Sequence, residues 1–254
     1  MRIIFASCGN DSVALIQWAL DNLDEELHIA YSDTKWGADW WPERVRLVKH
    51  WVEKTGNTFH TIDSEGFEGL VRRKKAFPTN GMGFCSYDLK IEPASRWLEE
   101  FDPDKKAVCM TGVRRCESEN RKDWPEFKED SPNHGGRTLH SPLVDHDDTM
   151  RDELITRTPF PILPHRSAEC WPCINANIKD LQLLGEKDVD RIEALELEID
   201  GLKKNDGERF MFRSKKMRGA KGIRQVVARA RRGGGWYSPD QEDLFGCESG
   251  FCGD

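Results

Sequence analysis

The sequence predicts an α/β protein with a mostly parallel sheet that helices cover on both faces. Short apolar runs alternate with longer segments of helical apolar spacing, and this alternation repeats along the first half of the chain. Two parallel strands need a crossover, which is usually a helix packed on the sheet. The 254 residues suffice for one such three-layer domain over 1–165 and a helical, loop-rich, cysteine-containing appendage over 166–254.

The first predicted unit is a strand, a small polar turn and a helix. Residues 2–7 form an apolar run that leads into Cys8-Gly9-Asn10-Asp11-Ser12. Apolar residues then recur at helical spacing over 13–23, which predicts a helix directly after the turn.

The following units continue the same order. The predicted strands are 27–31, 59–62 and 107–111, and the predicted helices between them are 40–55 and 92–101. Residues 124–166 are rich in Pro, His and Asp, which is typical of loops that cover a site. A helical stretch is predicted over 177–201, and a glycine break follows at 233–235.

The composition suits a globular protein without a membrane partner. Hydrophobic residues make up 37% of the chain and charged residues 33%. No apolar run approaches the roughly 18 residues of a membrane span, and residues 1–7 lack the apolar core and cleavage site of a signal peptide. We therefore expect a cytoplasmic protein whose eight cysteines serve metals or redox chemistry rather than structural disulfides.

One segment has a charge opposite to that of the rest. Its basic residues lie within 203–232, so that 201–232 carries +10 and the remainder −17 of the net charge of −7. Lys and Arg interspersed with Ile223, Val226 and Val227 predict a basic helix that contacts nucleic-acid phosphates. A solvated helix that balances the acidic remainder explains the same pattern equally well.

The turn at 7–12 has the composition of a phosphate-binding loop. It lies where open α/β sheets bind ligands, between the carboxyl end of a strand and the start of a helix. Gly9 lets the backbone approach an anion, free N–H groups favour negative charge, and Ser7 and Ser12 add hydroxyl donors. An ordinary strand-to-helix turn, with Asp11 or Ser12 as the N-cap, accounts for the same residues.

Four further motifs follow this loop in sequence order. They are Asp33-Thr34 with Gly37, Cys85-x4-Lys90, Gly112-x-Arg114-x-x-Glu117-Ser118-x-x-Arg121, and the stretch from His140-Ser141-Pro142-Leu143 to Cys170-x-x-Cys173. The loop itself is similar to an SGGxDS signature in which Cys8 replaces a glycine. Together, over about residues 1–200, the chain resembles the phosphoadenosine phosphosulfate (PAPS) reductase-like family of PP-loop, or adenine nucleotide alpha-hydrolase-like, proteins.

This resemblance implies a Rossmann-like fold that holds ATP or an adenylylsulfate-type nucleotide near the first loop. Lys90 is then a catalytic candidate that faces the phosphates, although solvated surface cations remain the alternative for each basic residue. The residues expected to bind the nucleotide are Ser7, Gly9, Asp11, Ser12, Asp33, Thr34, Gly112, Arg114, Glu117, Ser118 and Arg121.

The spacing of Cys170 and Cys173 predicts a metal or iron–sulfur site, with a redox pair as the rival interpretation. Four-thiolate sites need two more ligands, and Cys85 and Cys252 are the candidates that we choose. By the resemblance the centre is a [4Fe–4S] cluster, with zinc as the alternative. The family's reductases with this cluster have a Cys-Cys pair where this chain has Cys85-Ser86, so the fourth thiolate has to come from the C-terminal tail.

The remaining cysteines are assigned from their surroundings. Cys109 lies in an apolar run and is expected in the core, whereas Cys116 stays undecided. Related reductases carry a nucleophilic cysteine in a C-terminal tail, which makes Cys247 a catalytic candidate, and the roles of ligand and nucleophile stay open between Cys247 and Cys252.

Three functions are consistent with these patterns. In a sulfonucleotide reductase, a tail thiolate attacks the sulfur of an adenylylsulfate and a thioredoxin-type reductant releases the product. In an ATP-dependent nucleic-acid sulfurtransferase, the basic segment holds the acceptor. In a non-catalytic role, the chain is a cluster-bearing structural component of a larger assembly.

Overall fold

A computed structural model describes residues 1–79, 82–202, 210–212 and 220–233. Its centre is a six-stranded sheet in the order β3-β2-β1-β4-β6-β5, in which only β5 runs antiparallel to its neighbour. The strands are β1 (Arg2–Phe5), β2 (Leu27–Ser32), β3 (Thr58–Ile62), β4 (Val108–Met110), β5 (Phe127–Ser131) and β6 (Arg137–His140). The predicted α/β class with a mostly parallel sheet is therefore confirmed.

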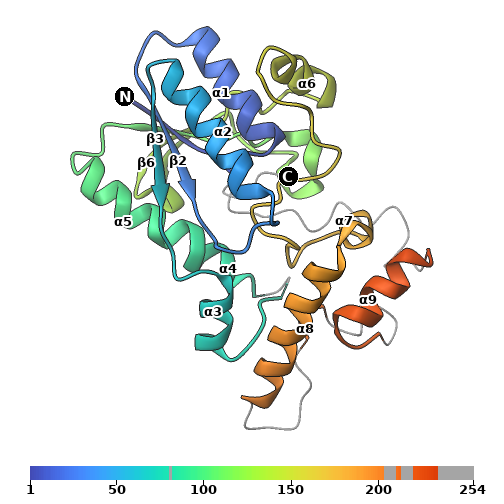
Figure 1. Ribbon diagram of the computed structural model, residues 1–254. Coiled ribbons are helices and arrows are strands. Elements are labelled where there is room, and N and C mark those ends of the chain that lie inside the picture. The colour runs from blue at the N-terminus through green and yellow to red at the C-terminus, as the bar shows by residue number, and fades with distance from the viewer. Residues whose placement is uncertain (80–81, 203–209, 213–219, 234–254) are drawn as a thin grey trace.

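Helices cover both faces of this sheet (Figure 1). The helices of the first 165 residues are α1 (Asn10–Asn22), α2 (Trp41–Lys54), α3 (Phe67–Lys74), the short α4 (Phe84–Ser86), the π-helix η1 (Tyr87–Ile91), α5 (Glu92–Phe101) and α6 (Asp148–Thr156). Three 3₁₀ turns, η2 (Arg115–Glu117), η3 (Glu119–Arg121) and η4 (Pro132–His134), follow β4 and β5. Because α1 and α2 lie on one face and α5 on the other, the chain changes face between β3 and β4.

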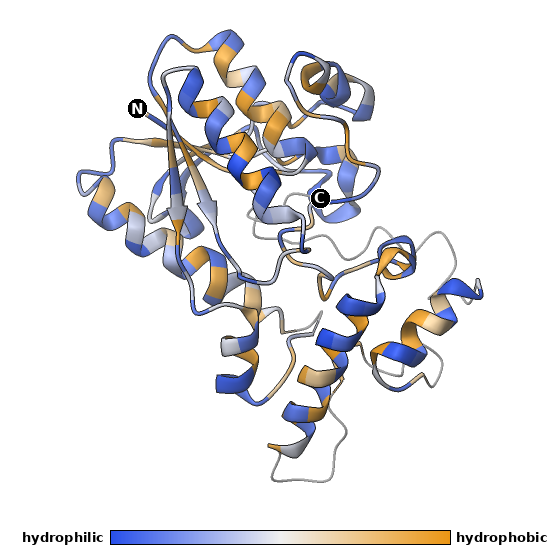
Figure 2. Ribbon diagram, viewed as in Figure 1, coloured by the Kyte–Doolittle hydropathy of each residue, from blue (hydrophilic) through white to orange (hydrophobic). Residues whose placement is uncertain are grey.

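The two faces bury two separate apolar clusters. Side chains alternate along β1, so that Ile4 packs with Ile29 of β2 under α1 and α2, whereas Ile3 and Cys109 pack under α5. Figure 2 shows the corresponding apolar stripe along the inner side of α1. Cys109 is fully buried, in agreement with its predicted place in the core.

The C-terminal helices form a group beside α3. They are α7 (Ile178–Leu183), α8 (Glu186–Gly201) and α9 (Gly222–Arg231), and α9 packs its apolar face on α7 and α8. The predicted helix over 177–201 is thus two helices, divided where Leu184 takes an extended conformation before Gly185. In the part of the chain that is described, no helix is both long and apolar enough to cross a membrane.

The region 124–166, which we predicted as loops, contains regular structure. It forms the strands β5 and β6 and the helix α6. In β5 only the last residue is buried and the others are exposed, so that this edge strand lacks the apolar alternation by which a strand is recognised. The prediction of loops was therefore wrong for these three elements.

Candidate nucleotide site

The loop 7–12 joins β1 to α1 at the carboxyl edge of the sheet. The Ser7 backbone N–H donates to Ser12 Oγ at 2.9 Å, and the two hydroxyl oxygens are 3.0 Å apart. The Gly9 N–H donates to Ser7 Oγ at 3.3 Å. These bonds curl the loop around its own hydroxyl groups, which lie 4–5% exposed at the start of α1.

Cys8 has the backbone conformation of a glycine. Its φ of 64° lies in the left-handed region, where a Cβ is unfavourable, and this explains why a glycine suits the position. The thiol is fully buried in the core cluster beneath α1 and α2, and burial raises the pKa of Cys8 far above its ordinary value. Cys8 therefore contributes its side chain to the core.

The segment after β4 packs directly against this loop. Arg114 Nε lies 2.7 Å from Asp11 Oδ1, and both side chains are almost fully buried. A Cβ on Gly112 would lie 2.9 Å from the carbonyl oxygen of Asp11, so only glycine permits this approach. The two motifs that the sequence placed about 100 residues apart are thus in contact at the junction of β1 and β4, where strand order reverses.

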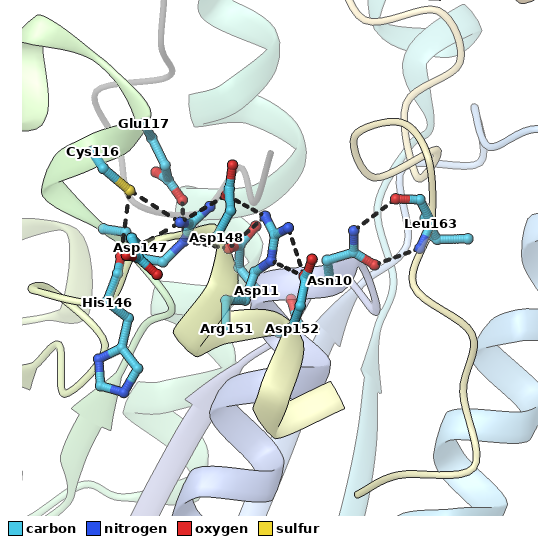
Figure 3. Close-up of polar contacts among 12 residues, drawn as sticks. Asn10, Asp11, Cys116, Glu117, His146, Asp147, Asp148, Arg151, Asp152 and Leu163 are labelled. Carbon is cyan, nitrogen blue, oxygen red and sulfur yellow. Dashed lines mark hydrogen bonds and ion pairs between the residues drawn. The ribbon is translucent and has the colours of Figure 1, made fainter. Parts of the chain in front are cut away.

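Helix α6 extends the ion-pair network around Arg114. Asp148 Oδ1 lies 3.1 Å from Arg114 Nη1 and 3.0 Å from Arg151 Nη1, and the Arg151 guanidinium is 3.9 Å from Asp11 (Figure 3). Arg114 also donates to Cys116 Sγ at 3.0 Å. The predicted loop region thus supplies charged groups to the site.

Glu117, Ser118 and Arg121 complete this side of the site. The Glu117 carboxylate is an ion-pair partner of both Arg114 and Arg121, and both arginines are buried. Ser118 Oγ is buried and has no hydrogen-bond partner within the described residues. The hydroxyl of Ser118 is therefore a candidate donor for a ligand.

A segment from 163 to 170 covers the loop from the other side. The Asn10 amide exchanges two hydrogen bonds with the backbone of Leu163, each 2.9 Å long (Figure 3). A Cβ on Gly9 would lie 2.9 Å from Cβ of Ser167. The approach of this segment gives Gly9 a second role, since any larger residue would displace Ser167.

Lys90 lies in the interior, where it pairs with a carboxylate that the sequence analysis did not identify. Lys90 Nζ and the Glu169 carboxylate form an ion pair in which both side chains are 5% exposed. The Thr34 hydroxyl donates to the Glu169 carbonyl oxygen at 2.6 Å. Asp33, beside it, is half-buried and accepts from the Lys35 N–H at 2.9 Å. The Asp33-Thr34 motif and the Cys85-x4-Lys90 motif therefore meet at Glu169.

The Cys-x-x-Cys segment is attached to the loop that follows β2. The Trp171 N–H donates to the Trp36 carbonyl at 2.7 Å, and Cys170 Sγ lies 3.5 Å from Thr34 Oγ1. The Asn175 N–H donates to Cys173 Sγ at 3.4 Å. Burial raises the pKa of the Cys170 thiol to about 12, and the charge of Lys90 opposes this shift.

A complete metal site is not assembled from the described residues. Within them no three His, Cys, Asp or Glu side chains form a group that could hold a metal ion. Cys85 is half-buried at the start of α4 and packs at the edge of the core. Cys247 and Cys252, the two candidate cysteines in the C-terminal tail, lie outside the described residues. The described residues therefore do not by themselves supply the four thiolates of the predicted centre.

Two arginines in the described part of the basic segment pair with acidic residues of α8. Arg224 of α9 forms ion pairs with Glu186, Asp190 and Glu193. Arg231 lies 3.7 Å from Glu186 and donates to the Leu184 carbonyl. These contacts agree with the interpretation that α9 balances the acidic remainder; much of 203–232 lies outside the described residues.

The glycine-containing loop and the buried arginines lie at the carboxyl edge of the parallel sheet, which is where open α/β proteins bind their ligands. A sequence model of the phosphoadenosine phosphosulfate reductase domain matches residues 2–177, more than half of the chain. The chain belongs to this family, which confirms the resemblance seen in its motifs and implies nucleotide binding.

Two individual proteins are also similar to this chain. An uncharacterized 37.8 kDa protein of Escherichia phage 186, encoded in the gpa 5′ region, is 29% identical over 154 residues, which are 55% of this chain and 41% of that protein. The chain thus matches less than half of that relative's length. The crystal structure of phosphoadenylyl-sulfate (PAPS) reductase from Candida auris, in a phosphate complex, matches with a TM-score of 0.44 and 16% identity over 63% of this chain and 73% of that chain.

Sequence reasoning missed several groups that the fold brings to the loop. Arg151 and Arg44 contact the loop, and Glu169 contacts Lys90, although none of the three is a named residue of a motif. Glu169 directly precedes the Cys-x-x-Cys pair, and a carboxylate beside two thiols was the one available signal. Arg44 and Arg151 lie within helices, where single arginines are ordinarily solvated, so the sequence offered no signal for them.

Proposed function

We propose that this chain binds an adenine nucleotide at the junction of β1 and β4 and acts in sulfonucleotide chemistry. The observation that supports the proposal best is the contact of two distant family motifs through Asp11 and Arg114 at 2.7 Å. This contact aligns the N-terminus of α1, whose N–H groups favour anions, with a segment that carries three buried polar groups, Arg114, Ser118 and Arg121.

The loop and the segments packed against it have different roles in the proposed binding. The backbone N–H groups at the start of α1 and the Ser118 hydroxyl suit phosphate oxygens, because both are donors. Arg114 and Arg121 already have carboxylate partners, so their charges are partly neutralised before a ligand arrives. Arg114 holds the loop in position through Asp11, and Arg121 holds Glu117 beside it. Lys90 supplies a further cation when the ligand shares its ammonium group with Glu169.

Nucleotide selectivity distinguishes this proposal from its rivals. Titration with adenosine 3′,5′-bisphosphate and with ATP, followed by calorimetry, should show micromolar binding of the bisphosphate and little affinity for ATP, as expected for sulfonucleotide use. ATP hydrolysis to AMP that RNA or DNA stimulates would instead support the nucleic-acid sulfurtransferase. The absence of binding for every adenine nucleotide would contradict the proposal and favour a structural component.

A second proposal concerns the Cys-x-x-Cys pair. We propose that Cys170 and Cys173 ligate a metal or cluster together with thiolates outside the described residues. The Asn175 N–H that donates to Cys173 Sγ supports it, since such N–H groups stabilise a ligating thiolate. Protein purified without oxygen should contain iron with sulfide, or zinc, and Cys173→Ser should lose it while Cys116→Ser retains it. A wild-type protein free of iron and zinc would refute the metal centre.

A further inference from the structure

Arg44, on the first turn of α2, is a buried cation without a carboxylate partner. Four arginines are buried in the described part of the chain: Arg44, Arg114, Arg121 and Arg137. The last three form ion pairs with Asp11, Glu117 and Asp102, respectively. For Arg44, which is 7% exposed, the described residues provide no such pair, and an isolated guanidinium in the interior is unfavourable.

The contacts that Arg44 does make leave part of its guanidinium unused. Nε donates to the Cys8 carbonyl oxygen at 2.7 Å, which ties α2 to the nucleotide loop. The guanidinium carbon lies 5.8 Å from the ring centre of Trp41 and 5.4 Å from that of Phe160. Nη2 is buried and has no hydrogen-bond partner in the described structure. Aromatic rings offset some of the buried charge, but they leave this N–H group without an acceptor.

A second unused donor lies beside it. The indole Nε1 of Trp41, three residues earlier on α2, is likewise buried and without a partner among the described residues. Indole N–H and guanidinium N–H groups are donors only, so both need an acceptor. The nearby Cys8 thiol does not neutralise Arg44, because burial keeps it protonated. Two unpartnered donors and one positive charge thus lie on the first turn of α2, which Arg44 ties to the nucleotide loop.

We propose that Arg44 and Trp41 form a binding subsite for a tetrahedral oxyanion of sulfur or phosphorus. A planar guanidinium matches such oxygens, and the negative charge supplies the partner that the described residues do not. The oxyanion is either a free ion or the terminal group of a bound nucleotide; in the second case the subsite rests on the function proposed above. Phe160 covers the guanidinium, so binding should also restrain the segment between α6 and Leu163.

Sulfate titration at constant ionic strength provides the test. Sulfate should raise the melting temperature of the wild-type protein, and Arg44→Met should weaken sulfate binding by about tenfold or more, the loss expected for a charged hydrogen bond. Arg46→Met is the matched control: Arg46 lies on the same helix, is exposed and pairs with Glu43, so its removal should leave sulfate binding unchanged. Equal sulfate binding by the wild type and Arg44→Met would overturn the proposal.

Trp41→Phe provides a second variant that keeps the aromatic ring and removes only the N–H donor. It should fold, lose several-fold in sulfate affinity, and need correspondingly more sulfate than the wild type to slow amide exchange over 157–165. If Arg44→Met does not fold, Trp41→Phe decides the question. Unchanged sulfate affinity and unchanged exchange in Trp41→Phe would then refute the subsite.

Nucleotide titrations separate the two sources of the oxyanion. If Arg44→Met weakens adenosine 5′-phosphosulfate but leaves AMP unaffected, the oxyanion is the terminal group of the nucleotide. If only sulfate is weakened, the subsite holds a free ion. Should no nucleotide bind the wild type while sulfate binding still depends on Arg44, the proposed function fails and the subsite stands.

Discussion

Asp11 and Arg114 form an ion pair of 2.7 Å that joins the nucleotide loop to the segment after β4, with both side chains at most 3% exposed. The two residues are 103 positions apart in sequence, and the pairing of β1 with β4 brings them together. The proximity of Asp11 raises the pKa of Arg114 against the effect of burial, so the guanidinium stays charged. The pair therefore stabilises both the fold and the shape of the site.

Removal of the Arg114 charge should destabilise the protein strongly. Arg114→Met leaves Asp11 buried without its main counter-ion, and breaking such a pair costs about 3–5 kcal/mol. Urea unfolding followed by circular dichroism measures this loss. Arg96→Met, which breaks an exposed pair with Glu92 on α5, should cost under about 0.5 kcal/mol. Similar losses in the two variants would show that burial does not govern the Asp11–Arg114 pair.

The thiols should react with alkylating agents in an order set by exposure and pKa. Cys116 is exposed, whereas Cys8 and Cys109 are fully buried, and burial raises the pKa of Cys109 to about 12. Only the thiolate is nucleophilic, so at about pH 8 Cys116 should be alkylated by iodoacetamide in the native protein and Cys8 and Cys109 only after unfolding. Peptide mass spectrometry measures the order. Rapid native alkylation of Cys8 would contradict its buried position.

Glu196 should make stability depend on pH. Its carboxylate on α8 accepts from the Met211 N–H at 3.0 Å and the Ile223 N–H at 2.9 Å, and burial raises its pKa from 4.5 to about 7. The folded state therefore holds this proton more tightly, and the resulting stabilisation is complete below pH 4.5 and is lost as the pH rises through 7.

The size of this effect is on the order of 3 kcal/mol between about pH 4.5 and 8, from the conversion of pKa differences to free energy. Denaturant unfolding across that range should show it in the wild type and in the control Asp190→Asn, an exposed carboxylate on the same helix, and Glu196→Gln should remove it. A pH dependence that persists in Glu196→Gln would assign it to another group.

Glu169 should compete with an anionic ligand for Lys90. In Glu169→Gln the Lys90 ammonium loses its carboxylate partner, which should lower the free energy of unfolding by about 3 kcal/mol. The released charge should tighten AMP binding by about tenfold, because the phosphate no longer competes with a carboxylate. Calorimetry measures both the affinity and the stability. Asp104→Asn, in an exposed pair with Lys106, is the control, and weaker AMP binding in Glu169→Gln would contradict this role.

The regular part of the fold was predictable because its strands are buried on both faces. Residues such as Ile3, Ile4 and Ile29 make continuous apolar runs, and the helices between them show their own spacing. The edge strand β5 has mostly exposed residues and β6 is four residues long, so neither carries a comparable signal. The division between α7 and α8 coincides with a local cap, in which the Gly185 N–H donates to Asp188 Oδ2 at 2.9 Å, and periodicity does not show it.

The site was predictable only where a motif spans a few adjacent residues. Ser7, Asp11 and Arg114 belong to such motifs, and the structure places Arg114 in an ion pair with Asp11 of the loop that Ser7 begins. Glu169 is 79 residues from Lys90, and Arg44 is 36 residues from Cys8. Partners so distant meet only through the tertiary fold, and the spacing of residues along the chain gives no sign of their pairing.

The most direct test of nucleotide binding uses the Ser118 hydroxyl, which is buried without a protein partner within the described residues. Calorimetric titration with adenosine 3′,5′-bisphosphate should show about tenfold weaker binding to Ser118→Ala than to the wild type, with no loss of stability. Ser131→Ala removes a buried hydroxyl that bonds His134 beside the start of β6, at the opposite edge of the sheet, and should leave affinity unchanged. Equal affinity in the wild type and Ser118→Ala, or no binding at all, would contradict a nucleotide at this site.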